Sequence, residues 1–403
     1  MSSWKKIRLE DACTTNANTY SPKEKWPFVN YLDTGNIVDN KIDSIQYIDT
    51  EKEKLPSRAR RKVRKDSIIY STVRPNQRHF GIIKTQPNNF LVSTGFTVID
   101  VNTSILDADF LYYRLSQNDL VETLHSIAEQ STSAYPSIKA SDIENIEIDV
   151  PDIDTQAAIG RFLRNLEEKI RCNEEINDNL LQQAQAIFKH WFTDNPNLDD
   201  MKQVPLAELC LVVTKGTTPT TLGKPFVTEG INFIKVESIL DNHTFDQNKF
   251  AFIDSETNNL LKRSIINSGD IIFTIAGTLG RFALIDDSVL PANTNQAVAI
   301  IRANQNKVTP DYLYSFFLGN WHNDYYRKRI QQAVQANLNL GTIKSLPIPI
   351  LPDKAMSEYL GILSPIITMT KANELEITKL RAIRDTLLPK LMSGQVDVSA
   401  IEL

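Results

Sequence analysis

The chain has few of the residues from which disulfides, metal sites and membrane spans are made. Its three cysteines (Cys13, Cys172 and Cys210) lie far apart, and its five histidines are scattered. This argues against a zinc site or a disulfide framework. No run approaches the roughly 18 to 20 apolar residues of a membrane span. The first residues lack the apolar core of a signal peptide. We therefore expect no bound metal, no membrane partner and a cytoplasmic location.

Catalytic signatures are absent as well. The sequence contains no G-x-x-x-x-G-K-[ST] motif for a nucleotide phosphate, and no Asn or Asp followed by a proline pair, as in adenine methyltransferases. The letters "PD" at 151–152 and "EEK" at 167–169 resemble a nuclease motif. Helical periodicity, however, places the second group roughly 20 Å along a helix from the first. Two ligands of one ion must lie within a few Å of it, so we reject that match.

Charge is distributed unevenly. The formal net charge is -5, but residues 52–84 contain eleven Lys or Arg and two acids, a local balance of +9. A solvated surface explains such a run as readily as a binding site does. A basic patch in an otherwise acidic chain is also what a phosphate-binding surface needs.

The chain repeats itself. Four segments recur in the same order at offsets of about 200 residues: "VNYLDTGNI" (29–37) in "INFIKVESI" (231–239), "DSIIY" (66–70) in "DIIFT" (270–274), "DADFLYYRL" (107–115) in "TPDYLYSFF" (309–317), and "IENIEIDVP" (143–151) in "IKSLPIPI" (343–350). This is a tandem duplication. In each half, short β-branched runs between turn signals predict a mixed α/β domain with a sheet of short strands. We expect a helix near 107–127 in the first half and near 309–333 in the second.

A long helix is predicted to follow each domain. Apolar residues recur at steps of three and four at Ile159, Leu163, Leu166, Ile170, Leu180, Ala184, Ile187 and Trp191, and again at Tyr359, Leu363, Ile366, Ile377, Leu380, Leu387 and Leu391. A seam of about 57 Å needs a partner, and an antiparallel pairing of the two helices supplies one. Asn173 and Asn373 occupy equivalent positions in the apolar seams of the two helices. They either fix the register of the helix pair or mark a place where water enters the seam. Pro365 should bend the second helix or mark its start.

Polar loops recur at matching places in both halves. Arginine can bond guanine bidentately and Asn or Gln can bond adenine, while Lys and Thr suit phosphates. The candidate DNA-binding residues of the first half are Arg58, Arg60, Arg61, Lys62, Ser71, Thr72, Arg74, Asn76, Gln77, Arg78, Lys84, Ser131, Ser133, Tyr135 and Lys139. Those of the second half are Lys215, Gly216, Thr217, Thr218, Thr220, Thr274, Gly277, Thr278, Arg281, Asn293, Asn295, Gln296, Gln335, Asn337, Asn339 and Lys344. Any one such loop is more simply an ordinary turn. Recurrence in both copies favours function.

These features resemble a known family. The duplicated layout, "GDIIFTIAGTLGRFALI" (269–285), "IPILP" (348–352) and above all "LLPKLMSGQVDV" (387–398) are similar to specificity subunits of type I restriction–modification enzymes. The loops "KGTTP" and "AGTLGR" match the family's pattern well. The first half departs from it, because "STVRPNQRHFG" replaces a glycine loop by Arg and Pro.

The resemblance implies an α/β (mixed α+β) fold with an internal pseudo-twofold repeat. Target-recognition domains at 1–150 and 196–350 would be separated by two long antiparallel helices, at 151–195 and 351–403, that form a coiled coil. Each domain would read half of a bipartite site in double-stranded DNA. The helices would set the spacer and dock two methyltransferase subunits, and restriction subunits would join them. S-adenosylmethionine, ATP and Mg²⁺ would belong to those partners, which leaves this chain without catalytic residues or cofactors.

Two alternatives stay open at this point. One is a self-sufficient DNA methyltransferase or nuclease, which would modify or cut DNA without partners. The other is an assembly scaffold, which would need no base-reading side chains.

Overall fold

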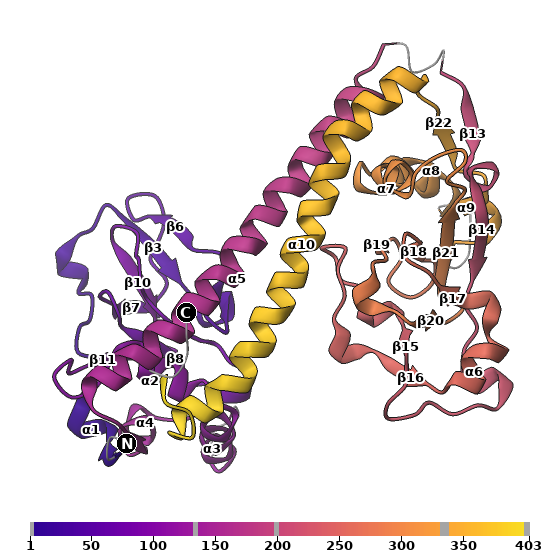
Figure 1. Cartoon of the computed structure of the whole chain (residues 1–403). Helices are drawn as coiled ribbons and strands as arrows, with labels where there is room; N and C mark the ends of the chain where they lie inside the picture. Colours follow the sequence, from indigo (N-terminus) through magenta and orange to yellow (C-terminus); the bar gives the residue numbers. More distant parts are fainter. Residues whose placement is uncertain (1–3, 132–135, 197–200, 331–337, 399–403) are drawn as a thin grey trace. The chain divides into compact units, whose positions relative to one another are not determined.

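The computed structural model describes residues 4–131, 136–196, 201–330 and 338–398. It divides into two compact units (Figure 1). Unit 1 comprises residues 1–170 and 379–403, and unit 2 comprises residues 171–378. Each unit therefore contains one sheet-bearing domain together with a section of each of the two long helices.

Unit 1 is built on two four-stranded sheets. The first has the order β2 (Cys13–Thr15), β11 (Phe96–Val101), β8 (Ile68–Ser71) and β9 (Phe80–Ile82). The second has the order β6 (Gln46–Asp49), β3 (Phe28–Leu32), β10 (Phe90–Ser93) and β7 (Ala59–Lys62). Two smaller pairs are β1 (Lys5–Arg8) with β12 (Glu147–Val150), and β4 (Ile37–Val38) with β5 (Lys41–Ile42). All pairings are antiparallel except β3 with β10.

Helices cover the core of unit 1. They are α1 (Leu9–Ala12), α2 (Ala108–Leu115), α3 (Asn118–Glu129), α4 (Ala140–Glu144) and the first part of α5 (Ile153–Phe188). Asp107 caps α2 by accepting a hydrogen bond from the Phe110 N–H at 2.9 Å, which satisfies one of the amides left open at a helix start. The core combines β8, β9 and β11 with α2 and with Leu163 of α5.

Unit 2 repeats this topology. Its first sheet has the order β14 (Cys210–Lys215), β21 (Val298–Ala303), β18 (Ile271–Thr274) and β19 (Phe282–Leu284). Its second sheet has the order β16 (Ala251–Ile253), β15 (Ile231–Ile234), β20 (Ala292–Thr294) and β17 (Ile265–Ile266). β13 (Gln203–Pro205) pairs with β22 (Pro347–Pro349). The helices are α6 (Ser255–Leu260), α7 (Pro310–Leu318), α8 (Trp321–Ile330) and α9 (Leu340–Lys344). The parallel pair again lies in the second sheet, between β15 and β20.

The helix expected near 107–127, and its counterpart in the second half, are each two helices. α2 and α3 are separated at Ser116 and Gln117, and α7 and α8 at Gly319 and Asn320. At Gly319 a Cβ would lie only 2.0 Å from the buried ring of Phe188. The chain there approaches the end of α5 too closely for any side chain. Apolar periodicity does not reveal such a break.

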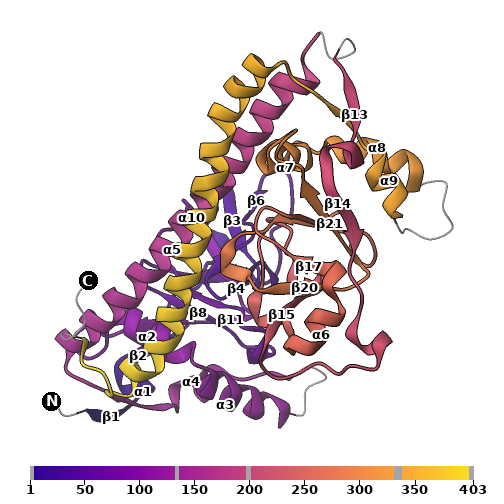
Figure 2. The same cartoon turned by 45° about the vertical axis from the view of Figure 1, so that its right-hand side comes forward.

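The two long helices are α5 and α10 (Asp353–Met392), and each runs through both units (Figure 2). In unit 1 the start of α5 shares a core with Leu391 and Met392 at the end of α10. In unit 2 the end of α5, including Phe188, shares a core with Tyr359 near the start of α10. The pairing is therefore antiparallel within each unit, as the seams predict. Pro365 does not mark the start of α10, which begins at Asp353 and continues through the proline.

The seam asparagines bond across the helix pair within unit 2. The Asn173 amide, 1% exposed, donates to Glu376 Oε2 at 2.7 Å. Asn373 donates to Asn177 Oδ1 at 2.8 Å, and Asn177 donates to Glu374 Oε1 at 2.7 Å. A slip of either helix would leave the buried amides of Asn173 and Asn177 without partners, which costs about 1–3 kcal/mol for each group. These contacts support the register interpretation.

Candidate nucleic-acid interface

One end of the first-named sheet of unit 2 gathers the predicted loops. The partner pairs Lys215–Ala299, Thr274–Val298 and Phe273–Phe282 show that β14 and β18 end where β21 and β19 begin. The loops at this end are residues 215–220, 274–281 and 295–297, and we call them the loop edge of unit 2. Antiparallel topology thus brings together segments that are 80 residues apart in the chain.

Backbone hydrogen bonds hold these loops together. The Ile275 N–H donates to Ala297 O at 2.8 Å, and Leu338 N–H donates to Ile275 O at 3.0 Å. Gly216 N–H donates to Val298 O at 3.3 Å, and Thr217 N–H to Thr294 O at 3.2 Å. The loops therefore form one connected surface.

Unit 1 builds its loop edge in the same way from residues 72–79, 93–95 and 136–139. Thr72 occupies the place of Ile275, because its N–H donates to Gly95 O and its carbonyl accepts from the Ile138 N–H, both at 2.8 Å. Thr94 N–H donates to Arg58 O at 2.9 Å, which attaches the start of β7. The frame is repeated although the side chains differ.

Several candidate residues lie exposed on these edges. In unit 2 they are Lys215, Thr220, Gly277, Thr278 and Gln296, with Thr217 and Thr218 half-buried. The Thr218 hydroxyl donates to Gln296, and Arg263 Nη2 donates to Thr217 Oγ1 at 3.1 Å. Arg263 is a cation that sequence reasoning missed. It precedes β17 in the second sheet, so only the fold brings it to this edge.

The exposed candidates of unit 1 are Arg58, Arg74, Asn76, Gln77 and Lys139, and Thr72 is half-buried. The rest of the basic run is less accessible. Arg60 and Arg61 are half-buried, and burial lowers the pKa of Arg61. Lys62 pairs with Glu24 and lies 5.2 Å from the centre of the Trp26 ring. The +9 segment is therefore only partly a continuous basic surface.

Four candidates are buried, and their prediction as DNA-facing residues is corrected. Ser71, Gly216, Thr274 and Asn293 all lie in the interior, with Thr274 and Asn293 0% exposed. The Thr274 hydroxyl accepts from Arg281 N–H at 2.9 Å, and the Asn293 amide donates to Asn258 Oδ1 at 2.8 Å. The sequence marks them as polar residues next to loops, but both faces of these strand ends are covered, so their polar groups serve the frame.

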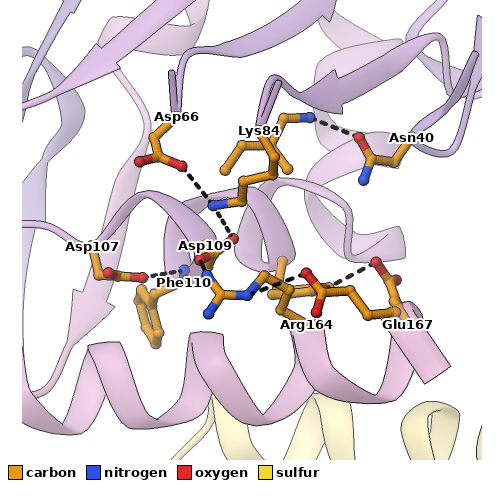
Figure 3. A network of polar contacts seen from close by, with 11 residues as sticks. Asn40, Asp66, Lys84, Asp107, Asp109, Phe110, Arg164 and Glu167 are labelled. Carbon is orange, nitrogen blue, oxygen red and sulfur yellow. Dashed lines mark hydrogen bonds and ion pairs between the residues drawn. The ribbon is translucent and has the colours of Figure 1, made fainter. Parts of the chain in front are cut away.

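Lys84 is also placed differently from the prediction. Its Nζ lies 2.7 Å from Asp66 and 2.6 Å from Asp109, and Arg164 of α5 pairs with the same Asp109 at 2.6 Å (Figure 3). Burial raises the pKa of Asp109, and the two cations oppose that shift. Tyr113 donates to Glu167 at 3.0 Å beside this cluster. Lys84 therefore joins the domain of unit 1 to α5 and is not available on its loop edge.

The remaining candidates have local roles or lie outside the described residues. Asn295 accepts from Ala297 N–H at 3.0 Å, and Asn339 caps α9 by accepting from Thr342 N–H at 2.8 Å. Ser131 is half-buried and Lys344 is exposed. The candidates outside the described residues are Ser133, Tyr135, Gln335 and Asn337.

Arg78 and Arg281 have their guanidinium groups engaged by protein acceptors. Arg281 pairs with Asp241 through Nε at 2.7 Å and Nη2 at 2.8 Å. Arg78 Nε pairs with Asp39 at 2.6 Å, and its Nη2 donates to Ser116 O at 2.9 Å. Nη1 donates in addition to Ile239 O in Arg281 and to Asn118 Oδ1 in Arg78, so three of the five N–H donors of each guanidinium group are engaged within the protein.

Within the described ranges, no cluster of three or more His, Cys, Asp or Glu side chains has the arrangement of a metal site. Across the same ranges, no helix has the length and apolarity needed to cross a membrane.

A duplicated mixed α/β domain with one loop edge per copy has the architecture of a two-site binding protein. The family model "Type I restriction modification DNA specificity domain" matches residues 1–182 and again residues 198–381. The chain belongs to this family, and the two matches coincide with the internal repeat.

Individual proteins support the same assignment. The chain is 26% identical to the type I restriction enzyme HindI specificity subunit of Haemophilus influenzae, over 98% of this chain and all of that protein. It is 22% identical to the MjaIX specificity subunit of Methanocaldococcus jannaschii, over 80% of this chain and 76% of that protein. The crystal structure of the type I restriction–modification S subunit from M. genitalium has a TM-score of 0.63 at 16% identity, with 97% and 96% of the two chains covered. It shares the fold.

Proposed function

We propose that this chain is the DNA sequence-recognition subunit of a type I restriction–modification complex, in which each loop edge reads one half of a bipartite target. The observation that carries this proposal is the loop edge itself, built twice on the same backbone hydrogen bonds. Thr72 bonds Gly95 and Ile138 in unit 1 as Ile275 bonds Ala297 and Leu338 in unit 2. The two loop edges share these backbone hydrogen bonds but expose different side chains, and recognition of two different half-sites requires such a difference.

The chain's own role in this proposal is binding. Lys215, Arg263 and Arg58 supply positive charge for phosphates, and Asn76, Gln77 and Gln296 supply amides for base edges. α5 and α10 would set the distance between the half-sites and dock two methyltransferase subunits, to which restriction subunits would be added. The methyltransferase chemistry, with S-adenosylmethionine, and the ATP- and Mg²⁺-dependent steps would take place in those partners.

The phosphate role of Lys215 can be tested through salt dependence. We expect Lys215→Ala, in the complex with the methyltransferase subunits, to weaken binding of cognate and scrambled duplexes to a similar extent. The slope of log affinity against log salt should fall by about one. Lys307→Ala is the matched control, since Lys307 is an exposed lysine just past the end of β21, at the end of the same sheet opposite to the loop edge. Binding by Lys215→Ala with an unchanged slope would show that the loop edge of unit 2 does not face DNA.

A further inference from the structure

In unit 2, a turn that follows β15 in the chain is attached to the loop edge. This turn comprises residues 239–243. Arg281, the residue before β19, reaches it with all three guanidinium nitrogens: Nε and Nη2 bond Asp241, and Nη1 donates to Ile239 O at 3.0 Å. The ring of His243 stacks on Phe282 with centroids 3.9 Å apart. Side chains thus lock the turn onto the edge strand.

Unit 1 locks the corresponding segment, residues 37–40, which comprises β4 and the turn that follows it, with different residues. Arg78 pairs with Asp39 at 2.6 Å, and Asp39 N–H donates to Arg78 O at 2.9 Å. The carbonyl of Ile37, which corresponds to Ile239, is contacted by His79 Nδ1 at 2.6 Å. Two neighbouring residues in unit 1 therefore make the contacts that Arg281 alone makes in unit 2.

The recurrence of these contacts identifies what they do. The sequences of the two loops differ, since "STVRPNQRH" stands where unit 2 has "TIAGTLGR". The same carbonyl and an equivalent aspartate are nevertheless engaged in both units. Arg281 uses three of its five N–H donors on this turn, two of them in a side-on contact with Asp241, so the protein fixes the plane of its guanidinium group. The geometry points to a positioning role, in which the arginine fixes the shape of the loop edge.

We propose that Asp39 and Asp241 are specificity-determining positioning residues. Each holds, through Arg78 or Arg281, the segment 37–40 or the turn 239–243 against its loop edge, so that the exposed side chains of that edge are presented in one arrangement. This inference rests on the proposed function and deepens it. It assigns Arg78 and Arg281 to the support of the readout surface, and it adds two aspartates that the sequence pattern did not indicate.

These residues can be changed without unfolding the domain. The Asp241 side chain is 81% exposed and that of Arg281 is 23% exposed, so Asp241→Asn changes a group in solvent and leaves the packed core of the domain untouched. A loss of recognition in such variants would therefore report on the shape of the edge. The thermal transition of each variant, compared with wild type, verifies that the fold persists.

The test is a double-mutant cycle on DNA binding. The full chain with its methyltransferase subunits is titrated with a duplex carrying the half-sites found by methylation mapping, and with duplexes in which one half-site is scrambled. We expect Asp241→Asn and Arg281→Ala each to reduce the preference for one intact half-site about ten-fold. The double variant should lose no more than either single variant, because both changes break one contact. Asp241→Glu should restore part of the preference.

Measuring the preference for each half-site separately distinguishes a positioning role from a general loss of stability. Asp39→Asn should relax only the other half-site, and the salt slope should stay at the wild-type value in every variant. Glu10→Gln, which removes an exposed carboxylate bonded to Arg8 at the opposite end of the unit 1 sheet from the loop edge, is the control and should change neither half-site.

Two results would overturn the proposal while leaving the proposed function intact. Tighter DNA binding by Asp241→Asn, with a salt slope lowered by about one in Arg281→Ala, would show a direct phosphate contact masked by the aspartate. Unchanged half-site preferences in both aspartate variants would show that the turn has no part in recognition. A wild-type complex without any half-site preference would overturn both the inference and the proposed function.

Discussion

Replacing Gly216 with alanine should abolish modification of the target by the complex. The added Cβ would lie 2.0 Å from Thr294 O, 2.4 Å from Thr294 C and 2.5 Å from Asn295 O. All three are backbone atoms at the start of the 295–297 turn, so they cannot rotate away as the end of a side chain could. The strand end at residue 215 must separate from that turn, which breaks the hydrogen bonds from Gly216 to Val298 and from Thr217 to Thr294.

The expected loss has two components. Overpacking costs about 1–3 kcal/mol of stability, which a domain of this size tolerates. Recognition should fall further, because the 215–220 and 295–297 loops, which carry Lys215 and Gln296, would no longer share a surface. Methylation of a plasmid carrying the target measures the loss, and melting curves measure the stability. Gly35→Ala is the control, since Gly35 belongs to neither loop edge and to neither long helix, and a Cβ there meets nothing within 4 Å. Wild-type methylation by Gly216→Ala would contradict this account of the loop edge.

Adding one helical turn to both α5 and α10 should move the complex to a different target. A turn adds about 5.4 Å of axial length, and DNA rises about 3.4 Å for each base pair. The spacer between the half-sites should therefore lengthen by one or two base pairs, and modification of the original target should be lost. Insertions after Ile170 and after Thr378 place the extra residues where each helix passes from one unit to the other.

Methylation mapping in cells carrying this variant reads out the new spacer directly. The half-site sequences should be unchanged, because the insertions lie outside both loop edges. An insertion in α5 alone is the control. It displaces Asn173 and Asn177 from their partners on α10 and should lower stability instead of yielding a new spacer. Unchanged spacing in the doubly extended variant would reject the idea that the helices set the distance.

The two domain copies and the two long helices were predictable because repetition and apolar periodicity are properties of the sequence itself. Matching segments at offsets near 200 predict two copies of one domain, and the apolar steps through Leu163 and Leu363 predict the antiparallel helices. Pro365 misled this reasoning. Removal of one N–H does not end a helix that tertiary contacts hold on both sides of the proline, and Leu363 and Ile367 are both buried.

The site was predictable as a set of loops but not residue by residue. Sequence patterns place Thr274 and Asn293 next to loops, whereas the register of β18 and β20 determines that both are covered. The ion pairs of Lys84, Arg78 and Arg281 depend on acids 18 to 40 residues away in the chain, which no local motif connects. Arg263 reaches the edge only because β17 joins the second sheet.

Long-read methylation mapping of cells that carry this chain with its methyltransferase partner tests the central claim most directly. The account predicts an asymmetric motif of two short half-sites, separated by a spacer of fixed length and free sequence, with modified adenines that disappear when the chain is omitted. A modified motif that persists without the chain, or a single uninterrupted motif, would contradict it.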